Sequence, residues 1–167
     1  MKKLSKNEIV HKKIYNSLDE FKHQLNIWRF EGNRIVFTNG CFDLIHLGHI
    51  DYLAKSADLG TKLVVGLNSD LSTSNLKGPN RPVTHQKSRS AILASLFFVD
   101  AVILFDNATP INLITGIKPD VLVKGADYNL HEIVGGQVVS ENGGEVKTIE
   151  FLAGYSTTSI INKIKAS

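Results

Sequence analysis

The sequence TNGCFDLIHLGH, residues 38–49, decides the fold that we expect for this chain. An apolar, β-branched run at residues 34–37 precedes it and is typical of a buried strand, while apolar residues recur with helical period over residues 50–57. The stretch therefore joins a strand to a helix. Strand-to-helix junctions of this kind are typical of proteins that alternate the two elements.

The start of the predicted helix is a favourable place for an anion, because the first helical N–H groups lack partners and the helix dipole is positive there. Gly40 and Gly48 leave room for a close approach. His46 and His49 are three residues apart, so both rings lie on one face of a first helical turn and both could donate to one phosphate group. A polyphosphate would favour their protonated forms.

Two other interpretations of the histidines remain open at this point. One ring could cap the helix while the other packs in the interior. A zinc site is the second alternative, but it lacks a third ligand: Cys41 is the single cysteine, and no acidic residue has helical spacing from both rings.

The string His46-Leu47-Gly48-His49 resembles the HxGH signature of the nucleotidyltransferase superfamily, and the longer stretch is similar to its sugar-phosphate and alcohol-phosphate branch. Further strings resemble, in this order, the adenylyltransferase domain of ADP-heptose synthases: LNSD at 67–70, LKG at 76–78 with RPV at 81–83, VLVKGADY at 121–128 and STT at 156–158. The resemblance runs from about Arg34 to the C-terminus. It implies transfer of AMP from ATP to D-glycero-D-manno-heptose 1-phosphate.

Length and composition fit one domain, with 167 residues of which 43% are hydrophobic. We expect a nucleotidyltransferase domain at 33–167 and an N-terminal helical extension at 1–32. No apolar run approaches the roughly 18 residues that span a bilayer, and the Lys-rich start lacks the apolar segment of a signal peptide, so a cytoplasmic protein without membrane contact is expected. Cys41 is expected to be a partly buried filler and not a nucleophile.

The formal net charge is only +3, and much of the excess lies among the lysines of the first 22 residues. In the same region Ile14, Leu18, Phe21, Leu25 and Trp28 recur at four- and three-residue steps, which predicts one amphipathic helix. Without interleaved aromatic and basic residues, nucleic-acid binding is not expected. The apolar stripe must be buried against the sheet of the same chain or against a second subunit, and a homodimer is the expected assembly.

The rest of the chain alternates strand-like and helix-like segments. Residues 62–67, 101–105, 120–123 and 145–150 are expected to be strands, and residues 88–97 and 109–116 helices, the latter with Thr109 as its cap and Pro110 at its first position. Together with the strand at 34–37 this predicts an α/β fold with a doubly wound, five-stranded parallel sheet, the Rossmann-like fold of the nucleotidyltransferases. Ligands of such sheets bind beyond the carboxyl ends of the strands, where the strand order reverses.

Residues 72–86 contain two prolines and little periodicity, which predicts a long loop. Because Lys77 and Arg81 lie in it, we expect a flap over bound substrates, the alternative being a solvated loop without function. At the C-terminus, Ser156, Thr157 and Thr158 stand at the start of a predicted helix, where their hydroxyls could cap the helix and bind phosphate. Ile161 stands where the superfamily often has a basic residue, which leaves Lys77, Arg89 and Lys124, in this order, as candidate cations for the outer phosphates.

Resemblance and position together imply roles for these residues. His46 and His49 would hold the α- and β-phosphates, with Lys77 as a further catalytic cation, and Asp43, Lys77 and Arg81 would bind the sugar phosphate. The predicted nucleotide-binding residues are Thr38, Asn39, Gly40, Cys41, Phe42, Gly48, Arg89, Lys124, Gly125, Asp127, Ser156, Thr157 and Thr158. ATP is expected to bring Mg²⁺, but no carboxylate cluster indicates a metal site made by the protein.

Two other functions stay open. A cytidylyltransferase for glycerol 3-phosphate or a related polyol phosphate shares the HxGH and STT strings, and a fold of this kind could also serve as a non-catalytic nucleotide-binding module. ADP-heptose synthases often join this domain to a sugar kinase. We therefore expect a separate heptose kinase to act before this protein.

Overall fold

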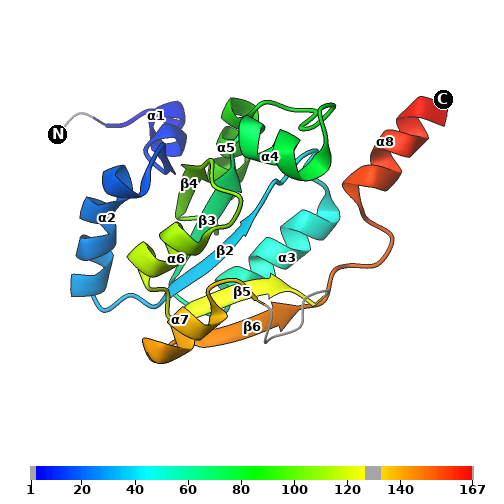
Figure 1. Cartoon of the computed structure of the whole chain (residues 1–167). Coiled ribbons are helices and arrows are strands. Elements are labelled where there is room, and N and C mark those ends of the chain that lie inside the picture. Colours follow the sequence, from blue (N-terminus) through cyan, green and yellow to red (C-terminus); the bar gives the residue numbers. More distant parts are fainter. Residues whose placement is uncertain (1–2, 127–132, 167) are drawn as a thin grey trace.

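In the computed structural model, which describes residues 3–126 and 133–166, six parallel strands form a single sheet with helices on both faces (Figure 1). The strands are β1 (Ile14–Tyr15), β2 (Ile35–Gly40), β3 (Lys62–Asn68), β4 (Ala101–Phe105), β5 (Val121–Gly125) and β6 (Glu145–Ile149). The helices are α1 (Lys6–His11), α2 (Leu18–Phe30), α3 (Leu47–Ala57), α4 (Asp70–Lys77), α5 (Gln86–Ser95), α6 (Ile111–Ile117), α7 (Gly136–Glu141) and α8 (Thr157–Ala166). The predicted α/β parallel sheet is confirmed.

The order of the strands across the sheet is β1-β4-β3-β2-β5-β6. From β2 the chain builds outward through β3 and β4 on one side and then returns to place β5 and β6 on the other. The strand order therefore reverses between β2 and β5, directly beside the loop that carries both histidines. In doubly wound sheets this position opens a crevice for ligands.

The prediction of five strands is wrong by one, because β1 adds a short sixth strand at the edge of the sheet. Its two residues pair with Val102 and Ile103 of β4. The single N-terminal helix that the spacing predicted is consequently two helices with β1 between them. The Ser17 hydroxyl accepts a hydrogen bond from the Glu20 N–H and starts α2 there, so Ile14 lies in the strand instead of in the apolar stripe.

The remaining part of that stripe is buried against the sheet of the same chain. Phe21, Leu25 and Trp28 of α2 pack with Ile35 and Phe37 of β2 in one core layer, to which α6 and α7 also contribute. The sequence left open whether the stripe is buried against the sheet or against a second subunit, and the structure shows that it is buried against the sheet. The homodimer and the domain boundary at residue 32 stay predictions. The second layer covers the other face of the sheet with residues of α3 and α5.

Two other predicted elements need correction. Helix α4 occupies the first half of the region predicted as a loop, because the Ser69 hydroxyl caps it by accepting from the Ser72 N–H at 3.1 Å. At α6, Pro110 takes the N-cap position and no side chain caps the helix, so the predicted cap at Thr109 is wrong. Within the described residues, no helix has both the length and the apolar character that crossing a membrane requires.

Candidate active site at the carboxyl edge of the sheet

A cavity of about 510 Å³ opens at the reversal point of the sheet. Segments that follow β2, β3 and β5 line it together with the start of α8. Most of the predicted site residues lie in this lining: Asn39, Gly40, Cys41, Phe42, Asp43, His49, Lys77, Arg81, Lys124, Gly125, Thr157 and Thr158. Residues from widely separated parts of the chain therefore meet where the fold places ligands.

The loop between β2 and α3 has an unusual backbone course. Phe42 and Leu44 both have positive φ angles, 45° and 50°, a region that non-glycine residues seldom occupy. Gly40 packs against the Phe42 ring, since a Cβ atom at this glycine would lie 3.1 Å from Phe42 Cε2. The two positive φ angles and the close packing at Gly40 thus mark the turn that joins the end of β2 to the start of α3.

The two imidazoles are stacked on each other, with ring centroids 3.9 Å apart and planes inclined by 23°. His46 occupies the N-cap position of α3 without a hydrogen bond from its side chain to the helix, so the capping alternative does not hold. Both Nδ1 atoms are buried and have no hydrogen-bond partner among the described residues. His49 lines the cavity itself, and His46 reaches the site through its stacking contact with His49.

Neighbouring rings hold this pair from both sides. The Phe42 ring meets His49 edge-on at 5.4 Å, and the Tyr155 ring lies nearly parallel to His46 at 6.5 Å. Gly48 makes this arrangement possible, because a Cβ atom there would lie 3.1 Å from both His46 Cε1 and Tyr155 Cβ. The glycine of the motif thus supports the histidine rings and does not line the cavity.

Burial lowers the pKa of both histidines. For His49 the pKa falls to about 4, because desolvation and the neighbouring His46 oppose its charge more than Asp43 favours it. For His46 desolvation lowers the pKa as well. Both rings are therefore neutral near pH 7 in the free protein. A bound polyphosphate would shift each pKa upward, which favours the protonated forms.

Asp43 is almost completely buried and accepts four hydrogen bonds from the segment 81–84. The donors are Arg81 Nε at 2.8 Å, the Val83 N–H at 2.8 Å, the Thr84 N–H at 3.0 Å and the Thr84 hydroxyl at 3.1 Å. Burial raises the pKa of this carboxyl, but the hydrogen bonds outweigh that effect and lower it. In this structure Asp43 anchors the segment that carries Arg81, a role different from the direct contact with the sugar phosphate that we expected.

Three cationic side chains line the same cavity. Lys77 is the last residue of α4. Arg81 donates through Nε to Asp43, and its terminal nitrogens form no hydrogen bond with a described residue. Lys124, at the end of β5, donates to the Asn39 side chain. The cavity thus has positive charge on both sides of the histidine loop, which suits a polyanionic ligand.

The start of α8 is attached to the same loop. The Thr157 hydroxyl donates to the Asp43 carbonyl oxygen at 2.7 Å, and Thr157 and Thr158 both line the cavity. Ser156 lies outside the lining, and its hydroxyl accepts from the Ser159 N–H at 3.1 Å, as a helix cap does. Beyond this start, α8 stands apart from the sheet and buries none of its described residues (Figure 1).

Besides Gly48 and Ser156, two further predicted ligands lie outside the cavity lining. Thr38 is fully buried, and its hydroxyl is hydrogen-bonded to the Tyr52 hydroxyl at 2.8 Å. Arg89 is also fully buried, and its guanidinium donates to four protein oxygens. The geometry therefore does not favour the predicted contact of Arg89 with phosphate. Asp127 lies outside the described residues, and its predicted role stays a prediction.

The cavity also contains residues that sequence reasoning missed. These are Tyr52, Asn68, Leu76, Ala108, Thr109, Pro110, Ile133, Val134 and Phe151. Asn68 and Phe151 had a usable signal, because they end or follow a predicted parallel strand, where ligands gather. The apolar members had none, since their side chains resemble ordinary core residues in sequence.

Among the described residues no group of three or more His, Cys, Asp or Glu side chains could hold a metal ion. Asp43, the one acidic residue among the described residues of the lining, already accepts four hydrogen bonds. The described part of the cavity therefore offers a divalent cation no free carboxylate. The donor set fits an anion better than a metal.

The comparisons with known proteins agree with this geometry. Residues 37–163 match the model of a protein family described as cytidylyltransferase-like. Over 148 residues the chain is 52% identical to the bifunctional protein HldE of Methylobacillus flagellatus, and over 149 residues it is 55% identical to the bifunctional protein HldE of Campylobacter fetus subsp. fetus. The chain belongs to the cytidylyltransferase-like family of nucleotidyltransferases, as its HxGH string predicted.

These alignments cover 89% of this chain but only 30% and 31% of the two relatives, so the chain spans about 30% of their length. Among solved structures, the lipopolysaccharide core biosynthesis protein from Thermoplasma volcanium is 30% identical with a TM-score of 0.57, over 72% of this chain and 98% of that one. Pantoate-beta-alanine ligase from Francisella tularensis, 15% identical, has a TM-score of 0.58 over 92% of this chain and 78% of that one, a likeness of fold alone.

Proposed function

We propose that this chain is an adenylyltransferase that transfers AMP from ATP to D-glycero-D-manno-heptose 1-phosphate. The products are an ADP-heptose, for use in cell-surface glycans, and pyrophosphate. The observation that carries the proposal is the stacked pair His46 and His49, whose buried Nδ1 atoms lack partners among the described residues, beside a cavity lined by Lys77, Arg81 and Lys124. The choice of heptose is supported by the strings of the sequence that resemble ADP-heptose synthases.

In the proposed reaction, an oxygen of the acceptor phosphate attacks the α-phosphorus of ATP in line. A new P–O bond forms there, the bond from the α-phosphorus to the oxygen that bridges to the β-phosphorus breaks, and pyrophosphate leaves with both electrons of that bond. The nucleophile is already an anion, so no general base is needed. The protein must bring two anions together and stabilise the charge that grows during transfer.

The residues of the cavity suit these tasks. Since neither Nδ1 has an acceptor, the useful donors of His46 and His49 are their Nε2–H groups, which would bind the α- and β-phosphates. Lys77 and Lys124 would balance the charge of the triphosphate, and Thr157 and Thr158 would donate to its outer part. Arg81, held through Nε by Asp43, would offer its terminal nitrogens to the acceptor phosphate.

Mg²⁺ is proposed to enter with ATP, coordinated by phosphate oxygens and water. No residue of the described chain is assigned as its ligand, and no step above depends on it. The reaction is placed in the cytoplasm, where nucleoside triphosphates are available. A heptose kinase acting earlier stays a prediction.

A cytidylyltransferase is the second candidate, since the matching family is described as cytidylyltransferase-like. The test measures pyrophosphate release with ATP or CTP against both anomers of the heptose 1-phosphate and against glycerol 3-phosphate. Release that needs ATP and a heptose 1-phosphate together supports the proposal, while release with CTP and glycerol 3-phosphate supports the second candidate. A protein with both histidines changed to alanine is the control, and no release with any pair would contradict a transferase.

A further inference from the structure

Arg89 of α5 is a fully buried cation, 0% exposed, and it lies outside the lining of the cavity. A buried guanidinium is costly unless its N–H groups are paired. Here Nε donates to the Thr84 carbonyl at 3.0 Å, Nη1 to the carbonyls of Cys41 at 2.5 Å and Asn68 at 2.9 Å, and Nη2 to Asp70 Oδ1 at 2.7 Å. One side chain therefore binds four acceptors.

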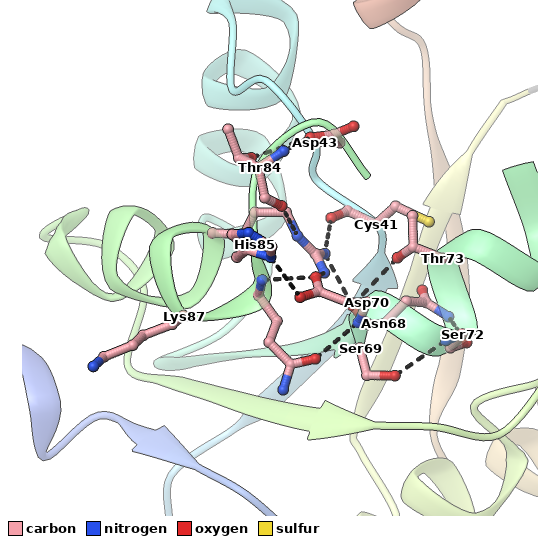
Figure 2. Close-up of polar contacts among 12 residues, drawn as sticks. Cys41, Asp43, Asn68, Ser69, Asp70, Ser72, Thr73, Thr84, His85 and Lys87 are labelled. Carbon is pink, nitrogen blue, oxygen red and sulfur yellow. Dashed lines mark hydrogen bonds and ion pairs between the residues drawn. The ribbon is translucent and has the colours of Figure 1, made fainter. Parts of the chain in front are cut away.

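These acceptors belong to separate segments that meet at the carboxyl edge of the sheet. Cys41 follows β2, Asn68 ends β3, Asp70 begins α4, and Thr84 precedes α5; Figure 2 shows these labelled residues drawn together. Asp70 supplies the opposite charge, and although burial raises its pKa, the hydrogen bonds from Arg89 and the Gln86 N–H lower it overall. The network thus has a cation and an ionised carboxylate at its centre.

The contact with the Cys41 carbonyl orients one peptide of the histidine loop. The Cys41–Phe42 peptide is trans, so its C=O and N–H point in opposite directions. The C=O points to Arg89, which lies outside the cavity lining, whereas Cys41 and Phe42 both lie in that lining. The Phe42 N–H therefore points away from Arg89, and no described residue accepts a hydrogen bond from it.

We propose that Arg89 is a positioning residue: it holds the Cys41–Phe42 peptide so that the Phe42 N–H donates to a phosphate oxygen of the bound nucleotide. This inference rests on the proposed function. It replaces the predicted direct contact of Arg89 with phosphate. The left-handed backbone of Phe42, φ 45°, is then a conformation that the Arg89 contact helps to maintain.

The test compares Arg89→Lys with Arg29→Lys. A lysine keeps the charge but loses the fork that reaches several acceptors. Arg29 is a matched control, because its guanidinium also binds a carboxylate, Asp120 at 2.7 Å, and the backbone carbonyls of Ile117 and Lys118, but these lie before β5 at the opposite edge of the sheet. Both variants lose a comparable set of bonds, and only one of them touches the histidine loop.

Two readouts are taken for each protein: the dissociation constant for ATP by calorimetry, and the NMR signals of the Cys41 carbonyl carbon and the Phe42 amide with and without ATP. In the wild type we expect ATP to shift the Phe42 amide. Arg89→Lys should bind ATP about tenfold to a hundredfold more weakly and should shift both signals in the free protein. Arg29→Lys should match the wild type in ATP affinity and in both signals, whatever its thermal stability.

The inference is overturned if Arg89→Lys binds ATP like Arg29→Lys with the Phe42 amide still responding. Should Arg89→Lys fail to fold, the wild type alone decides: an ATP-induced shift of the His49 ring without one at the Phe42 amide contradicts the inference and leaves the proposed function intact. If no signal of the cavity moves with ATP, the nucleotide site itself is wrong, and the inference falls with it.

Discussion

His46 and His49 lie against each other with buried nitrogens that no described residue satisfies. Buried polar atoms are nearly always paired in native proteins, and the exceptions concentrate at functional sites. Here the unpaired atoms belong to two neutral rings whose other nitrogens are available to a ligand. At the scale of single residues, the proposed chemistry therefore depends on the Nε2–H donors of His46 and His49, whose rings the fold keeps in place.

Removing either ring should slow the reaction strongly while leaving the fold intact. We expect His46→Ala or His49→Ala to lose roughly 2.7 to 4 kcal/mol of transition-state stabilisation, about a hundredfold to a thousandfold in kcat, as for a single oxyanion-hole donor. Pyrophosphate release measures kcat, and circular dichroism checks the fold. His23→Ala, on the exposed side of α2, is the control, and near-normal turnover in either site variant would remove that ring from the mechanism.

The low pKa of His49, about 4, makes the stability of the free protein depend on pH. Unfolding returns this ring to its ordinary pKa near 6.5, so the unfolded state binds more protons between these values. The stability that the protein gains by burying this ring in its neutral form is fully present above pH 6.5. It is lost as the pH falls toward 4, by on the order of 3 kcal/mol in all.

Urea unfolding between pH 7 and 4.5 measures this dependence, and His49→Ala should show a flatter profile. Asp43 and Asp70 do not interfere, because their lowered pKa values confine their effect to pH below about 3.8. Equal slopes for the wild type and the variant would show that His49 is not buried in its neutral form.

At the scale of elements, the strands were the easiest to predict. Four of the five predicted strands are buried on both faces, and a run of apolar residues without alternation indicates such a strand directly. Helix α4 and strand β1 were not predicted, and each has its own physical reason. Small polar residues such as Ser72 and Thr73 are buried in α4, so its sequence lacks an apolar period, and β1 is only two residues long.

The cavity could be predicted only in part. Its location followed from the rule that ligands bind at the carboxyl ends of parallel strands, and residues such as Asn39 and Lys124 do lie there. Which side chains face it was harder to infer. Thr38 shares a face of β2 with buried Val36, two residues earlier, and a count of alternating positions would have placed it in the core. Three of the four partners of Arg89, namely Cys41, Asn68 and Asp70, are distant in sequence and left no signal.

Asp43 connects two elements of the site, and its replacement should affect both binding and stability. Asp43→Asn keeps the shape but removes the charge that holds Arg81, at a distance of 2.8 Å. We expect the free energy of unfolding to fall by about 1 to 3 kcal/mol and the KM for the acceptor phosphate to rise, because the 81–84 segment loses its anchor.

Urea unfolding and steady-state kinetics measure the two effects. Asp19→Asn is the control, since its pair with Lys22 is exposed and should contribute less than about 1 kcal/mol. An Asp43→Asn protein as stable as this control, with an unchanged acceptor KM, would show that the four hydrogen bonds to Asp43 do not position the segment.

At the scale of the whole molecule, helix α2 is part of the main core. Phe21 is 0% exposed and packs with residues of the sheet, while Phe30 at the end of the same helix is 94% exposed. The N-terminal residues thus support β2, the strand from which the histidine loop starts.

We expect Phe21→Ala to lower the free energy of unfolding by about 3 to 5 kcal/mol through lost burial and the cavity it leaves. Phe30→Ala, the same substitution nine positions along the chain, should change it by less than about 0.5 kcal/mol. Denaturant unfolding followed by the fluorescence of Trp28, the single tryptophan, measures both. Equal effects of the two substitutions would mean that α2 does not pack as described.

The chain carries a single cysteine, Cys41, and the fold puts it in the wall of the cavity. An alkylating reagent of the iodoacetamide type would consequently label the protein at one position, next to the place where the nucleotide is expected. The labelling rate then becomes a reporter of occupancy that needs neither turnover nor an engineered probe. Saturating ATP should slow the labelling, and an unaltered rate would mean that ATP leaves this wall of the cavity uncovered.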